Sequence, residues 1–268
     1  MIGLPLTPDG ARYLSLAQGK PMPWPFCLRQ LLPRLCGSSA RLWRIASWVG
    51  VIGMAVGTAA LVGGVRGIAA GLMVAALPMN RLSLRYPVLV DAPAMALAVS
   101  AAACWHHGWL LPAMVLAILA GLTKETAPLF AAVYAGTPVL AAALLAPVIV
   151  AMLGDRGPDV PGMDRLGTEA LSHPFRVGIR LHTPRLFDPF LMLLPWGTAV
   201  VGLLRLDGQV GSCLALAYAQ LCVATDSVRL YQWAAPLLCG AAAQAVPEAV
   251  LPLLVAGVWW NPWAGDGS

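Results

Sequence analysis

The stretch GMAVGTAALVGGVRGIAAGL, residues 53–72, contains one charged side chain, and eleven of its twenty residues are Gly or Ala. Small side chains let helix backbones approach closely, which is how helices pack against one another inside a membrane. The stretch therefore predicts parts of two close-packed apolar helices, expected over 45–64 and 67–79.

The same character extends along the whole chain of 268 residues, of which 59% are hydrophobic and 11% charged. Mean hydropathy is +0.75, whereas a soluble domain carries roughly 25% charged residues. We therefore expect an all-α fold, a polytopic transmembrane bundle of seven to nine spans in an integral protein of the bacterial inner membrane. The expected spans are 45–64, 67–79, 88–104, 109–122, 127–153, 189–206, 210–224, 230–245 and 249–262.

Four regions make up one integrated membrane domain. Residues 1–44 predict an amphipathic segment, formed either by helices lying in the membrane interface or by a loosely ordered arm. A first transmembrane bundle over 45–153 and a second over 189–268 flank a polar loop, 154–188, which lacks a core of its own.

The topology depends on 127–153, which is either one tilted helix or a hairpin broken at Gly-Thr-Pro 136–138. In the hairpin case 15 of the 17 Lys and Arg residues fall on one face, and in the single-helix case they divide nearly evenly. The positive-inside rule would place the charge-rich face in the cytoplasm.

Several function classes are disfavoured. The bases are scattered through the loops and form no dense basic run, so nucleic acid is not an expected partner. The six cysteines include no C-x-x-C pair, and we expect neither a zinc site nor a disulfide framework. The first forty residues contain no apolar signal-peptide core.

Charged residues at the edges of apolar spans are functional candidates because they are costly there. TPDGARYLSLA, residues 7–17, places Asp9 ahead of an apolar-periodic run, where it could equally be a first-turn acid that favours the helix dipole. RLSLRYPVLVDAPAMALAV, residues 81–99, contains Arg85 and Asp91, and Asp91 could equally be an N-cap.

Two further stretches have the same character. GLTKETAPLF, residues 121–130, contains Lys124 and Glu125. As an alternative, it is a turn with its charges at the headgroups, in which Thr123 caps the next helix. CVATDSVRLYQWAAPLL, residues 222–238, contains Asp226 and Arg229, which share a helix face three residues apart, or form an interfacial ion pair of little energetic value.

The order of these motifs resembles the integral-membrane glycosyltransferases of the GT-C superfamily. The resemblance rests on an early acid followed by Y-x-x-L-A, then RYPVLVDAPAMAL (85–97), LAGLTKETAPLF (119–130) and RLYQWAAPLL (229–238). It covers most of the chain, although the motifs are short, the chain is short for the family, and the usual helix before the catalytic loop is missing ahead of Asp9.

The resemblance implies a mannosyltransferase-like enzyme, a hexosyltransferase that uses a polyprenyl-phosphate sugar donor in the bilayer. A sugar would move to an acceptor hydroxyl with inversion, and Asp9 would act as the general base. Arg85, Lys124 and Arg229 would hold the leaving phosphate, while Asp91, Glu125 and Asp226 would orient those cations or the sugar hydroxyls. Members of the superfamily act on the external face. The acceptor and any divalent cation stay open.

Two other classes fit the same residues. A transporter or channel would use Asp91, Glu125 and Asp226 along an ion path. A non-catalytic membrane subunit related to the GT-C proteins would suit the short chain and the missing helix.

Overall fold

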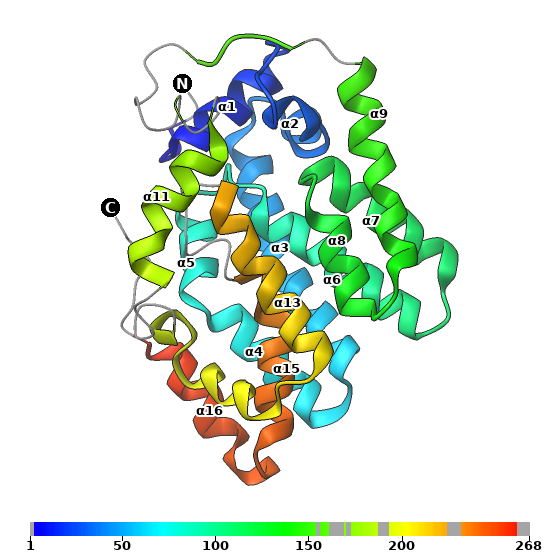
Figure 1. The fold of residues 1–268 in the computed structure, drawn as a ribbon, viewed down its shortest axis with the longest axis vertical. Helices are drawn as coiled ribbons and strands as arrows, with labels where there is room; N and C mark the ends of the chain where they lie inside the picture. Colours follow the sequence, from blue (N-terminus) through cyan, green and yellow to red (C-terminus); the bar gives the residue numbers. More distant parts are fainter. Residues whose placement is uncertain are drawn as a thin grey trace.

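The computed structural model describes residues 3–153, 156–160, 169, 173–186, 193–223 and 232–261. Regular structure in these ranges is helical, apart from one isolated bridge between Met22 and Arg156. The expected all-α class is confirmed for the described residues (Figure 1).

The first half of the chain forms α1 (Pro8–Ala17), η1 (Phe26–Leu28), α2 (Leu31–Cys36), α3 (Ala40–Val62), α4 (Gly64–Ala76), α5 (Pro78–Arg85), α6 (Asp91–His106), α7 (Leu110–Thr123) and α8 (Ala127–Ala135). The second half forms η2 (Pro138–Leu144), α9 (Leu145–Leu153), α11 (Pro174–Leu186), η3 (Leu194–Arg205), α13 (Gly208–Ala219), η4 (Gln220–Val223), η5 (Gln232–Ala234), α15 (Ala235–Ala245), η6 (Glu248–Val250) and α16 (Leu251–Trp259).

Each expected apolar segment overlaps one or more of these helices, but their lengths differ from the expectation. Among the described residues α3 is the one helix long and apolar enough to cross a membrane. Two bent pairs pass the same test when each is taken as one span: α4 with α5, bent by 52°, and Gln232–Ala245 with Glu248–Trp259, bent by 120°. The count is therefore one to three candidates by length and composition, and seven to nine spans are not established.

Glycines allow α3 to touch both of its main neighbours. A Cβ at Gly50 would lie 2.6 Å from the backbone nitrogen of Pro93 in α6, and one at Gly67 in α4 would lie 2.3 Å from the carbonyl oxygen of Ala59. Gly50 of α3 lies beside Pro93 of α6, and Gly57 lies beside Val99. Because residue numbers increase in the same direction along both helices, α3 and α6 run parallel. The close packing expected from residues 53–72 is present.

The segment 127–153 is a hairpin. Gly136 adopts the left-handed conformation (φ 64°) that ends α8, and the Thr137 hydroxyl accepts a hydrogen bond from the Val139 amide as η2 begins. The chain then returns, because Pro128 and Pro147 both lie against Gly121 of α7. The fold therefore adopts the hairpin alternative for this segment, and the distribution of the bases between two membrane faces stays a prediction.

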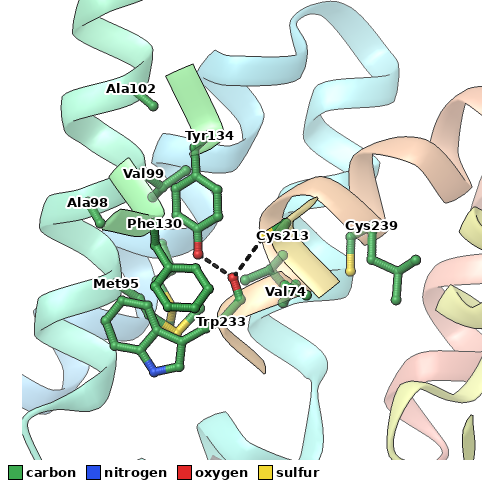
Figure 2. Close-up of a cluster of buried hydrophobic side chains, with 14 of the residues drawn as sticks. Val74, Met95, Ala98, Val99, Ala102, Phe130, Tyr134, Cys213, Trp233 and Cys239 are labelled. Carbon is green, nitrogen blue, oxygen red and sulfur yellow. Dashed lines mark hydrogen bonds between the residues drawn. The ribbon is translucent and has the colours of Figure 1, made fainter. Parts of the chain in front are cut away.

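The main core lies between α3, α4, α6, α8, α13 and α15. Figure 2 shows its aromatic centre, where the Trp233 carbonyl accepts hydrogen bonds from the Tyr134 hydroxyl and, at 3.5 Å, from the Cys213 thiol. The Phe130 and Trp233 rings lie 4.8 Å apart. These contacts join α8, α13 and the segment before α15 and fix the position of Trp233.

The N-terminal segment is a folded cap at one end of the bundle. Residues of α1, η1 and α2 pack with Trp43, Val88 and Val90 in a second apolar cluster. Tyr13, Phe26 and Trp43 are almost fully buried there. The loosely ordered arm is therefore wrong for residues 3–44, while the placement of these helices in a membrane interface stays a prediction. The cap brings Asp9 over the start of α6.

Candidate functional site

The best-supported site is a charged network at the capped end of the bundle. We define the charged network as a set of side chains joined by ion pairs and hydrogen bonds or by adjacency in the chain. Its members are Asp9, Arg12, Tyr13, Arg29, Asp91, Lys124, Glu125 and Asp159.

The helical hairpin of α6 and α7 creates the deepest pair. Asp91 is the first residue of α6 and Lys124 is the C-cap of α7, so the turn between the two helices returns Lys124 to the level of Asp91. The Lys124 ammonium donates to the Asp91 carboxylate, and both side chains are less than 10% exposed. The alternative in which the Lys124 side chain reaches the lipid headgroups is wrong, because its ammonium is enclosed by protein.

Glu125 makes a second pair with the cap. Arg29 donates two hydrogen bonds to its carboxylate, from Nε at 2.7 Å and from Nη2 at 2.8 Å, and a third at 2.6 Å from Nη1 to the Tyr13 hydroxyl. Burial alone would raise the pKa of Glu125, but the charge and hydrogen bonds of Arg29 outweigh burial and lower that pKa below its usual value. Glu125 is therefore held as a carboxylate.

Arg12 links α1 to the segment after α9. Its Nε and Nη2 donate to the two Asp159 oxygens at 2.8 and 2.6 Å, and its Nη1 reaches Asp9 at 3.4 Å. The hydrogen bond from Arg12 holds the pKa of Asp159 below its usual value. At 26% exposure, Asp9 is the most accessible carboxylate of the network, against 8% for Asp91, 17% for Glu125 and 14% for Asp159.

Aromatic rings contact the cations. The Phe26 ring centre lies 5.1 Å from the Arg12 guanidinium and 5.0 Å from that of Arg29, and Tyr13 meets Phe26 edge-on at 5.4 Å. The Lys124 ammonium lies 5.4 Å from the centre of the Trp233 ring. Cation–π contacts therefore hold all three network cations in place.

Unpartnered polar atoms border the network. Trp233 Nε1, Gln232 Oε1 and Gln220 Nε2 are buried without a hydrogen-bond partner, and the side-chain oxygen of Gln220 lies 3.3 Å from the Thr126 hydroxyl, one residue after Glu125. Burying such a group without a partner costs about 1–3 kcal/mol. Buried donors and acceptors in this state are places where an ordered water can bind.

Four of the seven predicted site residues lie in this network: Asp9, Asp91, Lys124 and Glu125. Arg85 is exposed at the end of α5, with its guanidinium 5.5 Å from the Tyr86 ring. Asp226 and Arg229 lie outside the described residues.

The capping alternatives have mixed outcomes. Thr7 is the N-cap of α1 and places Asp9 in the first turn, as the capping alternative predicts. Asp91 is not an N-cap, because Val90 holds that position. Thr123 does not cap α8 either, since its hydroxyl donates back to the Leu119 carbonyl in α7.

Sequence reasoning missed Arg12, Arg29 and Asp159 as partners. The sequence did contain an indication that Arg12 contacts Asp9, because Arg12 lies three residues after Asp9 and therefore on the same helix face. Arg29 and Asp159 are 96 and 147 residues from the partners that they contact, and spacing along the chain carries no information about such pairs.

The described residues contain no group of three or more His, Cys, Asp or Glu side chains that could hold a metal ion. The thiols of all six cysteines are free. Comparisons with protein-family models, with curated proteins and with solved structures find no match.

Proposed function

We propose that the chain is a membrane-embedded glycosyltransferase of the GT-C type, which moves a sugar from a polyprenyl-phosphate donor to an acceptor hydroxyl at the charged network. The observation that carries the proposal is the convergence of Asp9, Asp91, Lys124 and Glu125, from three separate stretches of sequence, on one end of the bundle.

Membrane placement is supported by the outer surface. Large apolar side chains point outward along α3, including Ile45, Trp48, Ile52 and Val56, each at least 46% exposed. Soluble monomers rarely expose contiguous apolar patches larger than a few hundred Å². We infer that lipid covers this face of α3. In the proposal, the shorter helices cross the bilayer as parts of bent or tilted spans. The bilayer is a bacterial inner membrane.

In the proposal, the charged network supplies the base for glycosyl transfer. In the proposed step, the Asp9 carboxylate takes the proton of the acceptor hydroxyl, whose oxygen attacks the anomeric carbon. The bond from that carbon to the donor phosphate breaks, with inversion, and the phosphate leaves with the electron pair. Asp9 suits the role of base because it is the carboxylate most accessible to an acceptor.

The other roles follow from charge. The seven charged members of the network comprise four carboxylates and three cations, so the network alone carries a net charge of −1 and does not neutralise a phosphate. In the proposal, Lys124 is shared between Asp91 and the leaving phosphate, while Arg85 and Arg229 supply the remaining charge. Glu125 and the unpartnered groups of Gln220, Gln232 and Trp233 bind sugar hydroxyls.

Substitution of the base tests the proposal. We expect Asp9→Asn to lower hexose release from polyprenyl-phosphate mannose, with water as the acceptor, by about 10²–10⁴-fold, the usual contribution of a general base. Asp207→Asn is the matched control, because Asp207 is an exposed carboxylate that caps α13. Full activity in Asp9→Asn would remove the base assignment, and no release by the unaltered protein would favour a transporter or a non-catalytic subunit.

Orientation is tested separately. The positive-inside rule places the network end in the cytoplasm, whereas the GT-C resemblance places it outside, and phosphate-binding loops are basic for functional reasons. We expect the cysteines introduced separately by Lys20→Cys and Val160→Cys to react with a membrane-impermeant maleimide from the external side, above the labelling of the six free cysteines in the unaltered protein. Cytoplasmic labelling of both would contradict transfer on the external face.

A further inference from the structure

A second site lies far from the charged network, at the C-terminal end of α3. A cleft of about 290 Å³ is lined there by Gly63, Gly64, Arg66, Arg205, Gln244 and Glu248. It adjoins a larger cavity of about 530 Å³, because the two share Arg205 and Gln244, and that cavity also reaches His106. His106 ends α6, which begins at Asp91 of the network. The cavity therefore lies about 22 Å from the network along this helix.

Two arginines, Arg66 and Arg205, and one carboxylate, that of Glu248, line this cleft. The Arg66 Nε is buried and has no hydrogen-bond partner, and the nearest Glu248 oxygen lies 3.8 Å away, too far for a hydrogen bond. Among the described residues no carboxylate pairs with Arg205. The cleft thus carries one net positive charge, and an arginine pair of this kind suits a phosphate.

The first turn of α4 also lines this cleft and contributes backbone amide donors. α4 has 13 residues and begins at Gly64, and its N-cap, Gly63, has no side chain to accept hydrogen bonds from the first-turn amides. A Cβ at either glycine would meet nothing within 4 Å, so the space beside this turn is open. Because α3 ends at this same glycine, the two helix dipoles offset each other here, and the contribution of the turn is its uncapped first-turn amides, which can donate to an anion.

An apolar groove leads away from the cleft. It has a volume of about 480 Å³ and lies between α4 and α16, lined mainly by Ile68, Leu72, Leu251, Val255 and Trp259. Val65 and Glu248 line both the groove and the cleft, so the two are continuous. A ligand that fits both has one negative charge at one end and a hydrocarbon chain at the other.

We propose that this cleft and groove form a binding site for one anionic lipid. The phosphodiester lies against Arg66, Arg205 and the first turn of α4, and one hydrocarbon chain lies in the groove against α16. The inference uses the proposed membrane placement but not glycosyl transfer, so an inactive protein would still bind the lipid.

Native mass spectrometry on protein from nanodiscs tests the site. We expect the unaltered protein to retain phosphatidylglycerol in preference to phosphatidylcholine. We expect Arg66→Gln/Arg205→Gln to reduce retained phosphatidylglycerol at least tenfold. The matched control is Arg41→Gln/Arg44→Gln, which removes two exposed arginines from the start of α3. Equal retention in the cleft variant and the control, or no preference for the anionic lipid, would overturn the proposal.

Two additional measurements distinguish a lipid site from a general loss of stability and from a site for free phosphate. Arg66→Lys/Arg205→Lys keeps both charges, so it should retain more phosphatidylglycerol than Arg66→Gln/Arg205→Gln, and equal loss in these two variants with an unchanged unfolding temperature would contradict the role of charge. Phosphatidylglycerol with brominated chains should quench Trp259 and Trp260 fluorescence, measured as the difference from Trp259→Phe/Trp260→Phe. Displacement of the lipid by millimolar glycerol phosphate, without any quenching, would show a free-phosphate site and overturn the lipid assignment.

Discussion

Replacing Glu125 by Gln should destabilise the folded protein strongly, because it removes the charge that neutralises Arg29. Arg29 is 10% exposed and Glu125 17%, and the two hydrogen bonds between them are 2.7 and 2.8 Å long. Breaking a buried pair by removing one partner costs about 3–5 kcal/mol, since the other charge stays buried. The Tyr13 hydroxyl still accepts from Arg29, so we expect a loss near the lower end of that range, about 3 kcal/mol.

Glu248→Gln provides the matched control for this substitution. Its pair with Arg66 spans 3.8 Å between side chains that are 63% and 41% exposed, and exposed pairs contribute about 0–1 kcal/mol. Denaturant unfolding in detergent, followed by circular dichroism, measures both variants. In Arg29→Met/Glu125→Gln neither partner leaves an unpaired charge behind, and we expect this double variant to be less destabilised than Glu125→Gln alone. Equal stabilities for Glu125→Gln and Glu248→Gln would show that the Arg29–Glu125 pair is not the buried, mutually dependent pair described above.

Two other predictions concern stability. The folded-state pKa values of Glu125 and Asp159 lie below the ordinary values of 4.5 and 3.8. The two carboxylates therefore contribute their full stabilisation at pH values above 4.5 and 3.8, respectively. This stabilisation is lost as the pH falls through their lower folded-state pKa values. Unfolding temperatures measured from pH 7 to pH 3 should fall at the acid end, and Glu125→Gln/Asp159→Asn should flatten that decline. Gly50→Ala should cost about 1–3 kcal/mol by overpacking, because its Cβ would meet the Pro93 backbone at 2.6 Å. Gly211→Ala, whose Cβ would meet nothing within 4 Å, should stabilise α13 by up to about 1 kcal/mol, and equal effects of the two glycine substitutions would contradict the close packing of α3 on α6.

The helices were predictable because hydropathy and small-residue content are local properties of the chain. The positions of α3, α4, α6 and α7 agree with the expected segments to within a few residues. The number of crossings was not predictable in the same way, because α4 and α5 meet at a 52° bend and η3 is interrupted by a kink at Gly197 (φ 52°). Such breaks depend on what packs beside them.

The candidate site was predictable in part. Asp91 begins the first helix of a helical hairpin and Lys124 ends the second, so the turn between the helices brings the two residues to the same end, and this follows from the order of the helices in the sequence. The pairing of Glu125 with Arg29 depends on how the N-terminal cap folds over the bundle, which no local pattern encodes. The sequence allowed either one tilted helix over 127–153 or a hairpin broken near Gly136. The packing of both Pro128 and Pro147 on Gly121 decides for the hairpin.

The most direct test of the proposed function is an experimental structure with polyprenyl phosphate, the lipid left after transfer. We expect density for the phosphate at the network end, within about 3–4 Å of the Lys124 ammonium or the Arg85 guanidinium. Density for the phosphate only in the cleft of Arg66 and Arg205, with none near Lys124 or Arg85, would contradict the assignment of the charged network as the donor site.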